Sequence, residues 1–531
     1  MREPRLRIPR AVSLAVCVLT LSVPAFAGDV KSAGDCAGLA ALRLPGAAVL
    51  SAEFHEAAAF KGADGKPVAN QIAFCRVVGR ATPSSDSDIR FEVWLPAAAW
   101  NGRLWGVGNG DFAGSISQRA LNIRMADGYA AVGTDTGHRT TDAADTRWAI
   151  GHLQQVVDFG HRAIHLAAVN AKRVVSAFYD RPPARAYFGA CSNGGRQALM
   201  EAQRYPEDYD GIIAGAPAHE WTSIYIGAGD WQFRQLADPA RLVPAAKLPA
   251  LRAAVAAACH APDGVVDEPK RCTFDPAVLA CGDAETDQCL TPPQLQTVRG
   301  FYAGNVSARE QPLQRSYAVG SEVGLDDVHY RSGPGTDDFF REVLGFWRDL
   351  VFEDAAWDPR SYDMERDGAL ATKKLATVLD ADSADLSRFA ARGGKLIVYQ
   401  GWVDPLVPPA GTIDYVERVE RTIGAERAKA AVRLFMAPGV SHCGGGDAPN
   451  QFGQFANGSG DPETSLGAAL QRWVEQGVAL EKIVARKLEK DDDPASKVVR
   501  TRPLCAWPRV ARHAGTGSID VAASFECKVS D

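Results

Sequence analysis

The sequence predicts an α/β fold in which a mainly parallel β-sheet is interrupted by one large insertion. Short apolar segments typical of buried strands alternate with helix-like segments up to about residue 216, and the same alternation resumes after residue 393. Residues 217–392 carry four cysteines and show no such alternation. We therefore expect one core formed by residues 28–216 and 393–531, with residues 217–392 inserted between its halves as a lid domain.

Both ends of the chain are expected to add to this core. Residues 28 to about 80 are predicted to form a β-rich edge at the N-terminal side of the sheet. Residues 480–531 are predicted to form an edge strand and a tail.

The first 27 residues have the features of a secretion signal. Four arginines precede the apolar run 11–21, and Ala25-Phe26-Ala27 has the small-residue pattern of a cleavage site. An uncleaved membrane anchor is the alternative, but the run is short for a bilayer span. The rest of the chain has neither a long apolar run nor a basic run, and its net charge is −6. We expect a periplasmic or secreted protein with no nucleic-acid partner and no membrane association in the mature form.

The cysteines predict disulfide bonds. Of the 11 cysteines, Cys17 lies in the signal segment, and an even number in the remaining exported chain is typical of disulfides. Pairing of neighbours gives Cys36–Cys75, Cys259–Cys272, Cys281–Cys289 and Cys505–Cys527, and leaves Cys191 and Cys443 for each other. Sequence alone leaves this connectivity open, and a zinc site is a competing interpretation, although the spacings match no compact zinc motif.

A serine lies in a sharp turn between an apolar strand and a helix-like segment. The turn is Ala190-Cys191-Ser192-Asn193-Gly194, and the strand before it covers residues 184–188. This arrangement is typical of the nucleophile elbow of α/β-hydrolases, although alanine stands where the motif G-x-S-x-G has its first glycine. Such a turn exposes the serine oxygen and directs the backbone N–H of Asn193 at a developing oxyanion.

Two later loops supply an aspartate and a histidine. Asp404 follows the apolar strand 395–399, and His442 lies in the glycine-rich loop after the strand 432–436. The order Ser192, Asp404, His442 is that of α/β-hydrolases, and each residue follows a strand, at the sheet edge where α/β sites form. His442 would accept the serine proton, and Asp404 would orient its imidazole.

The cysteines next to these residues support the same grouping. A Cys191–Cys443 bond and a Ser192–His442 pair would require the same close approach of two loops. By the entropic model the bond could contribute about 4 kcal/mol to stability. Cys191 as a thiol nucleophile is the competing interpretation.

Two further segments have candidate roles. The glycine-rich segment 106–114 follows a predicted strand and lacks the residues and spacing of nucleotide-binding loops. In a hydrolase, a loop at this place can donate a second oxyanion N–H, and a simple tight turn is the alternative. The aromatic segment 339–352 of the lid is predicted to be core, with the lining of an aromatic substrate pocket as the alternative.

Several of these motifs together resemble the tannase/feruloyl esterase family, which includes mono(2-hydroxyethyl) terephthalate hydrolase. The resemblance lies in the Cys-Ser turn, in Gly-Trp-Val-Asp-Pro-Leu-Val-Pro-Pro at 401–409, in Ser-His-Cys at 441–443, and in segments 133–138 and 148–160. It implies an α/β-hydrolase core with a large lid, a Ser-Asp-His triad beside a disulfide, and five disulfides in all. It also implies that Gly110 or its neighbour donates an oxyanion N–H beside that of Asn193.

The same resemblance bears on metal binding. Family members often carry a longer Asp-rich loop at residues 259–269, whose carboxylate and carbonyl oxygens bind calcium. Here the loop looks shortened and His260 replaces an acidic residue, while Asp263, Asp267 and the Val265 carbonyl remain. Calcium is therefore a candidate structural ion in the lid, and no cofactor is expected for catalysis.

The sequence thus predicts a secreted serine carboxylic ester hydrolase whose partner is a small-molecule aromatic ester. We expect cleavage of esters of the feruloyl or galloyl type through an acyl-enzyme intermediate. The alternatives are hydrolysis of terephthalate monoesters, transfer of the acyl group to an alcohol other than water, and non-catalytic binding of phenolics on the same scaffold.

Overall fold

The computed structural model describes residues 30–529, except 63–64, 66–67, 69–71, 262, 307–311, 325–337, 455–459 and 494. The predicted signal segment 1–27 lies outside the described residues. Within the described ranges, no helix combines the length and the apolar character needed to cross a membrane.

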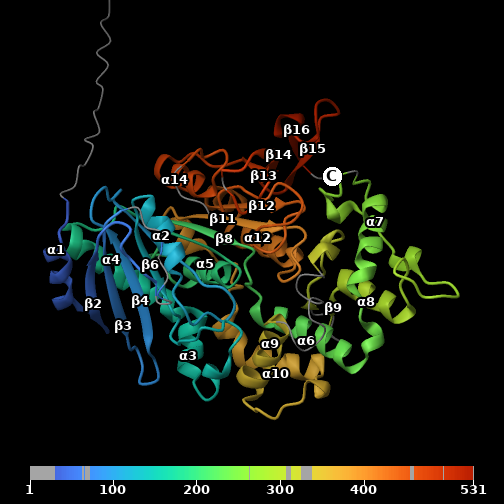
Figure 1. The fold of residues 1–531 in the computed structure, drawn as a ribbon, viewed down its shortest axis with the longest axis horizontal. Coiled ribbons are helices and arrows are strands. Elements are labelled where there is room, and N and C mark those ends of the chain that lie inside the picture. Colours follow the sequence, from blue (N-terminus) through green and yellow to red (C-terminus); the bar gives the residue numbers. More distant parts are fainter. Residues whose placement is uncertain are drawn as a thin grey trace, which may run out of the picture.

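A ten-stranded sheet forms the centre of the molecule (Figure 1). Its strands, in spatial order, are β1 (Arg43–Leu44), β2 (Ala47–His55), β3 (Phe74–Ala81), β4 (Ile89–Pro96), β6 (Ala130–Thr134), β5 (Arg103–Val107), β7 (Arg185–Cys191), β8 (Gly211–Gly215), β11 (Lys395–Gly401) and β12 (Val432–Ala437). The strands from β6 to β12 are parallel, and β1 to β4 extend them as an antiparallel edge. The predicted mainly parallel sheet and its β-rich N-terminal edge are both confirmed.

Helices cover both faces of this sheet, which explains why its central strands are apolar throughout. Every residue of β8 and β12 is buried, as expected for parallel strands packed on two sides. In β11, Val398 joins the apolar cluster on one face and Tyr399 the cluster on the other, because successive side chains of a strand alternate. The first face carries α4 (Ala163–Tyr179), α5 (Asn193–Arg204), α12 (Pro409–Ile423) and α13 (Ala425–Ala431), and the second carries α2 (Gln118–Ala126) and α14 (Leu466–Gln476).

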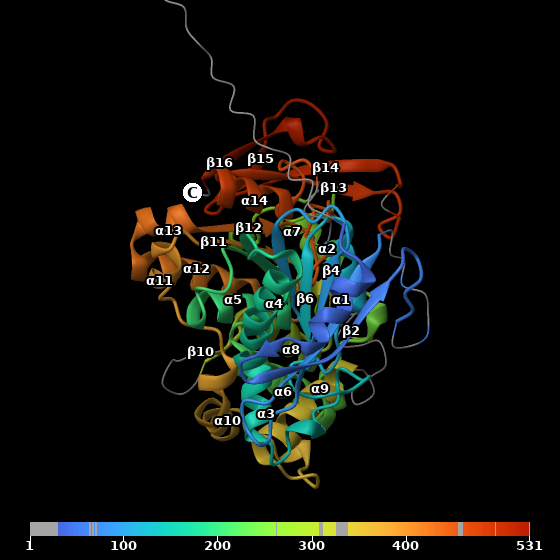
Figure 2. The ribbon, with the colours of Figure 1, turned by 90° about the vertical axis from the view of Figure 1, so that its left-hand side faces the viewer.

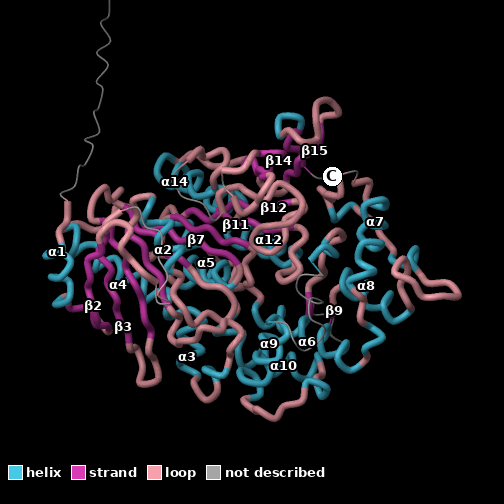
Figure 3. The backbone as a smooth tube through the Cα atoms, in the orientation of Figure 1, coloured by secondary structure: helices cyan, strands magenta, loops and turns pink. Residues whose placement is uncertain are grey.

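In the described part of the inserted segment between β8 and β11, the elements joined by loops are helices, apart from one short strand pair (Figure 3). Its elements are α6 (Trp221–Ala237), α7 (Leu248–Ala258), α8 (Pro292–Ala303), β9 (Asn305–Val306), β10 (Pro312–Gln314), α9 (Asp338–Gly345), the π-helix Phe346–Phe352, α10 (Met364–Leu379) and α11 (Ser387–Ala391). Phe346 and Trp347 of the aromatic segment are fully buried, so its prediction as core is confirmed for these residues. The lid extends from the sheet to α7 and α8, at the far end of the molecule from β2 and β3 (Figure 1).

The C-terminal segment differs from the predicted edge strand. β13 (Lys482–Leu488) and β14 (Val498–Cys505) form one hairpin, and β15 (Arg509–His513) and β16 (Phe525–Val529) form another. The hairpins form sheets of their own, and they also pack on the main sheet. Phe435 of β12 forms an isolated bridge with Ala506, the Trp507 N–H donates to the Leu434 carbonyl at 2.8 Å, and Ile483 and Leu504 share an apolar cluster with Phe435. Figure 2 shows both hairpins at the opposite end of the molecule from α3 (Leu153–Val157), α9 and α10.

All five predicted disulfides are present. Their Cα–Cα distances lie between 4.8 and 5.8 Å, within the range that a disulfide requires. The pairs are Cys36–Cys75, Cys191–Cys443, Cys259–Cys272, Cys281–Cys289 and Cys505–Cys527. None of these cysteines keeps a thiol, so the zinc interpretation and the thiol nucleophile are both wrong for them.

Candidate active site

Ser192 occupies a strained turn between β7 and α5. Its φ of 65° and ψ of −125° lie in a region that L-residues rarely adopt. Two hydrogen bonds hold the turn: the Ser192 N–H donates to the Gly215 carbonyl at 3.0 Å, and the Ser192 carbonyl accepts from the Arg196 N–H at 3.0 Å. The backbone therefore has the form of a nucleophile elbow, as the sequence predicted.

The alanine that replaces the first glycine of the elbow motif fits because glycines surround it. A Cβ placed on Gly194 would come within 2.4 Å of the Ala190 methyl, and one on Gly108 within 2.7 Å. A Cβ on Gly195 would lie 2.2 Å from the Gly215 carbonyl oxygen. The extra methyl of Ala190 therefore occupies space that two neighbouring glycines leave free.

Asp404 and His442 form a hydrogen-bonded pair at the carboxyl ends of β11 and β12. The His442 Nδ1 atom lies 2.9 Å from Asp404 Oδ2 and 3.1 Å from Oδ1. Asp404 is fully buried. Its Oδ1 accepts the N–H groups of Leu406 and Val407 at 2.9 Å each. These donors fix the carboxylate so that it presents an oxygen to the imidazole.

Gln400 is a supporting residue that sequence reasoning missed. Its Nε2 donates to Asp404 Oδ2 at 2.8 Å, and its Oε1 accepts from the Thr412 hydroxyl at 2.9 Å. The side chain is fully buried at the end of an apolar strand. An amide at the end of such a strand was the available signal, since a buried polar group needs partners.

The pKa of His442 is raised above its usual 6.5. Burial lowers it, but the Asp404 charge and hydrogen bond, together with the Asp111 charge, outweigh burial. Stabilisation of the imidazolium is what a general base needs when it holds a transferred proton.

The Cys191–Cys443 bond joins the loops that carry Ser192 and His442. Its Cα atoms are 5.8 Å apart, and each cysteine is the chain neighbour of a predicted catalytic residue. Among the described contacts of His442, none reaches the Ser192 hydroxyl. Catalytic hydrogen bonds often tighten only when substrate is bound. The structure thus brings the three loops together and forms the Asp404–His442 pair of the predicted triad.

The loop with the predicted oxyanion residue Gly110 is held against the elbow helix. The Asn109 N–H donates to Gln197 Oε1 at 3.1 Å, and Gln197 Nε2 donates back to Asn109 Oδ1 at 3.2 Å. The Asn109 Nδ2 also donates to the Thr134 carbonyl at 2.8 Å. One buried glutamine of α5 therefore ties Asn109, the chain neighbour of Gly110, to the elbow helix. No local pattern marked Asn109 or Gln197 for this role.

Asn193 is fixed through its side chain. Its Oδ1 accepts from Arg196 Nε at 2.9 Å, and both residues are fully buried. Arg196 Nη1 also donates to the carbonyls of Gly160, at 2.7 Å, and of Leu379, at 3.1 Å. Because Leu379 ends α10, one arginine connects the elbow to the last long helix of the lid.

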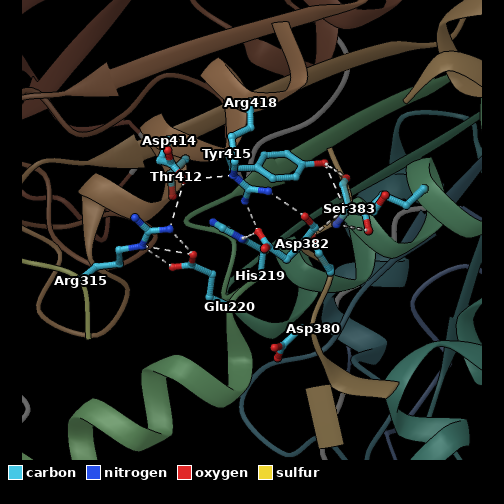
Figure 4. Close-up of polar contacts among 12 residues, drawn as sticks. His219, Glu220, Arg315, Asp380, Asp382, Ser383, Thr412, Asp414, Tyr415 and Arg418 are labelled. Atoms are coloured by element: carbon cyan, nitrogen blue, oxygen red, sulfur yellow. Dashed lines mark hydrogen bonds and ion pairs between the residues drawn. The ribbon is translucent and has the colours of Figure 1, made fainter. Parts of the chain in front are cut away.

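A polar network anchors the two ends of the lid on α12 (Figure 4). His219 and Glu220 lie where the chain enters the lid, and Asp382 lies where it returns. The atoms of these three side chains that could ligate a metal lie within 4.8 Å of one another. Glu220 is paired with Arg315 at 2.7 Å, and Asp382 with Arg418. The two guanidinium groups already balance the carboxylates, so we interpret the cluster as an anchor rather than a metal site.

The residues predicted to bind calcium are brought together, but around an arginine. Arg502 Nη2 donates to Asp263 Oδ2 at 2.8 Å, and Nη1 donates to Asp267 Oδ1 at 2.9 Å. The Val265 N–H donates to Asp263 Oδ1 at 3.2 Å. A guanidinium between the two carboxylates leaves no place for a divalent cation there, so these residues as they stand do not fit the calcium prediction.

Comparisons with known proteins agree with this architecture. The family model described as tannase and feruloyl esterase matches residues 75–528. The chain is 42% identical to an uncharacterized esterase of Xanthomonas campestris, over 98% of this chain and 95% of the relative. It is 31% identical to a probable feruloyl esterase of Arthroderma benhamiae, over 94% of each.

Solved structures show the same relationship. The crystal structure of feruloyl esterase B from Aspergillus oryzae is similar with a TM-score of 0.85 and 27% identity, covering 93% of this chain and 100% of that one. Tannin acyl hydrolase from Aspergillus niger shares the fold, with a TM-score of 0.74 and 20% identity over 94% of this chain and 95% of that one. The chain therefore belongs to the tannase and feruloyl esterase family and is a carboxylic ester hydrolase.

Proposed function

We propose that this protein is a serine esterase that hydrolyses esters of aromatic acids, of the feruloyl or galloyl type, through an acyl-enzyme intermediate. The observation that carries the proposal is the buried Asp404–His442 pair, linked by a disulfide to the strained turn of Ser192. This combination of nucleophile, base and orienting acid is that of acyl-transfer enzymes.

The proposed reaction begins with attack by Ser192 Oγ on the ester carbonyl carbon, while His442 Nε2 takes the hydroxyl proton. The carbonyl oxygen becomes an oxyanion that the N–H groups of Asn193 and Gly110 stabilise. Collapse of the tetrahedral intermediate breaks the ester bond, and His442 returns its proton to the leaving alcohol. Water then attacks the acyl-enzyme with His442 again as base, which releases the acid and restores Ser192.

The relatives support the aromatic acyl group. Their names include feruloyl esterase and tannin acyl hydrolase, whose acids are hydroxylated aromatics. Membership of this family favours the hydrolase over the non-catalytic phenolic-binding protein. Five disulfides and the predicted signal segment support a periplasmic or secreted location.

The test is hydrolysis of methyl ferulate, methyl coumarate, methyl gallate and mono(2-hydroxyethyl) terephthalate by the wild type and by Ser192→Ala. We expect kcat to fall by about 10³-fold or more in the variant. Ser176→Ala is the matched control, because its hydroxyl bonds only the Lys172 carbonyl within α4. Mass spectrometry of the quenched wild type should find the acyl group on the peptide that contains Ser192.

Three results would decide against the proposal. Wild-type turnover by Ser192→Ala would overturn the serine mechanism. Activity confined to the terephthalate ester would favour the alternative substrate class, and ester products formed with added alcohols would favour acyl transfer.

A further inference from the structure

Arg502 of β14 lies buried between two carboxylates of the lid. Its side chain is 3% exposed, and its two Nη atoms donate to Asp263 and Asp267 at 2.8 and 2.9 Å. The aspartates belong to the loop that follows α7, more than 230 residues earlier in the chain: the separations are 239 and 235. In Figure 1 the C-terminal hairpins lie next to α7.

Further arginines face the same loop from the same hairpins. Arg500 Nη1 lies 3.6 Å from Asp263 Oδ2, and Arg512 Nε lies 3.2 Å from Glu268 Oε1. The acidic loop therefore already has cationic partners from the C-terminal hairpins. A divalent ion placed between Asp263 and Asp267 would have to displace Arg502 and would meet repulsion from Arg500.

The segments that Arg502 connects are each closed by a disulfide. Cys259–Cys272 closes the acidic loop, and Cys505–Cys527 joins β14 to β16. The guanidinium also lies over the Phe525 ring of β16, 4.9 Å from its centroid. A planar group with several donors suits this place, because it bridges two carboxylates and stacks on a ring at once.

The acidic loop also contacts the segments that carry the catalytic pair. A Cβ placed on Gly439, in the loop that leads to His442, would lie 3.4 Å from Val265 Cγ1. A Cβ on Gly320 would lie 3.3 Å from Val266 Cγ2 and 3.9 Å from Val403 Cγ1, next to Asp404. By bonding Asp263 and Asp267, Arg502 thus holds a part of the lid that packs beside the active site.

We propose that Arg502 takes the structural place of a metal ion in this protein: its guanidinium fixes lid loop 259–272 to the C-terminal hairpins and makes the lid independent of calcium. Arg502 is assigned a role in the lid and none in the reaction, so this role can be tested independently of the serine mechanism.

The experiment compares thermal unfolding of the full mature chain in excess EDTA and in millimolar CaCl₂. We expect the wild-type Tm to be the same in both solutions. When the chelator-treated wild type is supplied with calcium and then washed, native mass spectrometry should find no calcium on the protein. Arg502→Gln removes the charge and leaves two carboxylates facing each other, so its Tm in EDTA should fall by at least about 5 °C. Calcium should restore part of that loss, because the freed carboxylates become available to the ion.

Three further variants separate the charge from a general loss of packing. Arg512→Gln removes a neighbouring cation without touching Asp263 or Asp267, and we expect a smaller Tm shift with no response to calcium. Arg502→Gln combined with Asp263→Asn relieves the uncompensated charge, so its Tm in EDTA should exceed that of Arg502→Gln alone. Arg502→Lys keeps the charge and provides a soluble variant if Arg502→Gln does not fold; its Tm should be insensitive to calcium.

Three results would overturn the proposal. The first is a wild-type Tm that falls in EDTA and recovers with calcium. The second is stoichiometric calcium on the washed wild-type protein. The third is an Arg502→Gln variant as stable as the wild type in EDTA.

Discussion

At the scale of single residues, the Asp404–His442 pair depends on the groups that surround it as well as on its own two side chains. Asp404 is held by two backbone N–H groups and by Gln400 before it meets His442. Burial lowers the pKa of His442, the Asp404 charge and hydrogen bond raise it, and the charge of Asp111, in segment 106–114, adds to the rise. A residue that takes no part in the proposed proton transfer therefore contributes to the ionisation of His442.

Asp111→Asn should shift the acidic limb of the pH–rate profile to lower pH. His442 must be neutral to accept a proton, so activity is lost as the pH falls through its pKa. Removal of the Asp111 charge lowers that pKa, and the enzyme should stay active at lower pH. The measurement is kcat/KM for methyl ferulate from pH 4 to pH 9.

The control for this shift is Glu426→Gln, which removes an exposed carboxylate on the first turn of α13. This variant changes the net charge by the same amount as Asp111→Asn, and the acidic limb of its pH–rate profile should stay at the wild-type pH. A limb that stays fixed in Asp111→Asn, or moves to higher pH, would contradict the assigned electrostatic role.

At the scale of elements, the site is made by loops at the carboxyl ends of neighbouring strands. β7 supplies the elbow, β11 the aspartate and β12 the histidine, and β8 holds the elbow through the Gly215 carbonyl. The loops meet because parallel strands end on the same edge of a sheet. The Cys191–Cys443 bond then links the first and last of these loops covalently.

Loss of this bond should reduce activity before it unfolds the core. We expect Cys191→Ala combined with Cys443→Ala to lower kcat by about tenfold or more, because the nucleophile and base are no longer held in register. Its free energy of unfolding should fall by about 2–5 kcal/mol. Activity and far-UV circular dichroism, followed against dithiothreitol concentration in the wild type, should show activity lost first.

The comparison is Cys281→Ser combined with Cys289→Ser, which opens a bond in the lid between residues only eight positions apart. That variant should keep kcat. Equal losses of kcat in the two double variants, or simultaneous loss of activity and structure on reduction, would argue against a positioning role for Cys191–Cys443.

At the scale of the whole molecule, stability depends on pH through buried acids away from the site. Glu201 of α5 is fully buried beside Asp208. Burial, followed by the Asp208 charge, raises the pKa of Glu201 well above its ordinary 4.5. The folded protein therefore holds a proton that the unfolded chain releases. That contribution to stability is complete below pH 4.5 and is lost as the pH rises through the folded pKa.

Glu201→Gln should remove this dependence, because the amide stays neutral at every pH. The variant should gain stability relative to the wild type as the pH rises from 4.5 to 8. Urea unfolding at several pH values measures the difference, with Glu426→Gln as an exposed control. A variant whose stability relative to the wild type does not increase with pH would contradict the assignment.

Much of this molecule is readable from its sequence because the relevant patterns are local or depend only on chain order. Apolar periodicity predicted the interrupted sheet, and the strand–Ser–helix turn predicted the elbow. An even cysteine count with short spacings led to four disulfides and left Cys191 and Cys443 for the fifth. The order Ser192, Asp404, His442 identified the loops that the sheet brings together.

Tertiary structure decided the contacts between residues far apart in the chain. Gln197 holds the predicted oxyanion loop, the C-terminal hairpins form sheets of their own, and Arg502 takes the carboxylates that resemblance had assigned to calcium. These outcomes share one physical reason. A buried charge or amide takes whichever partner packing places within about 3 Å, and no local pattern records which distant residue that will be.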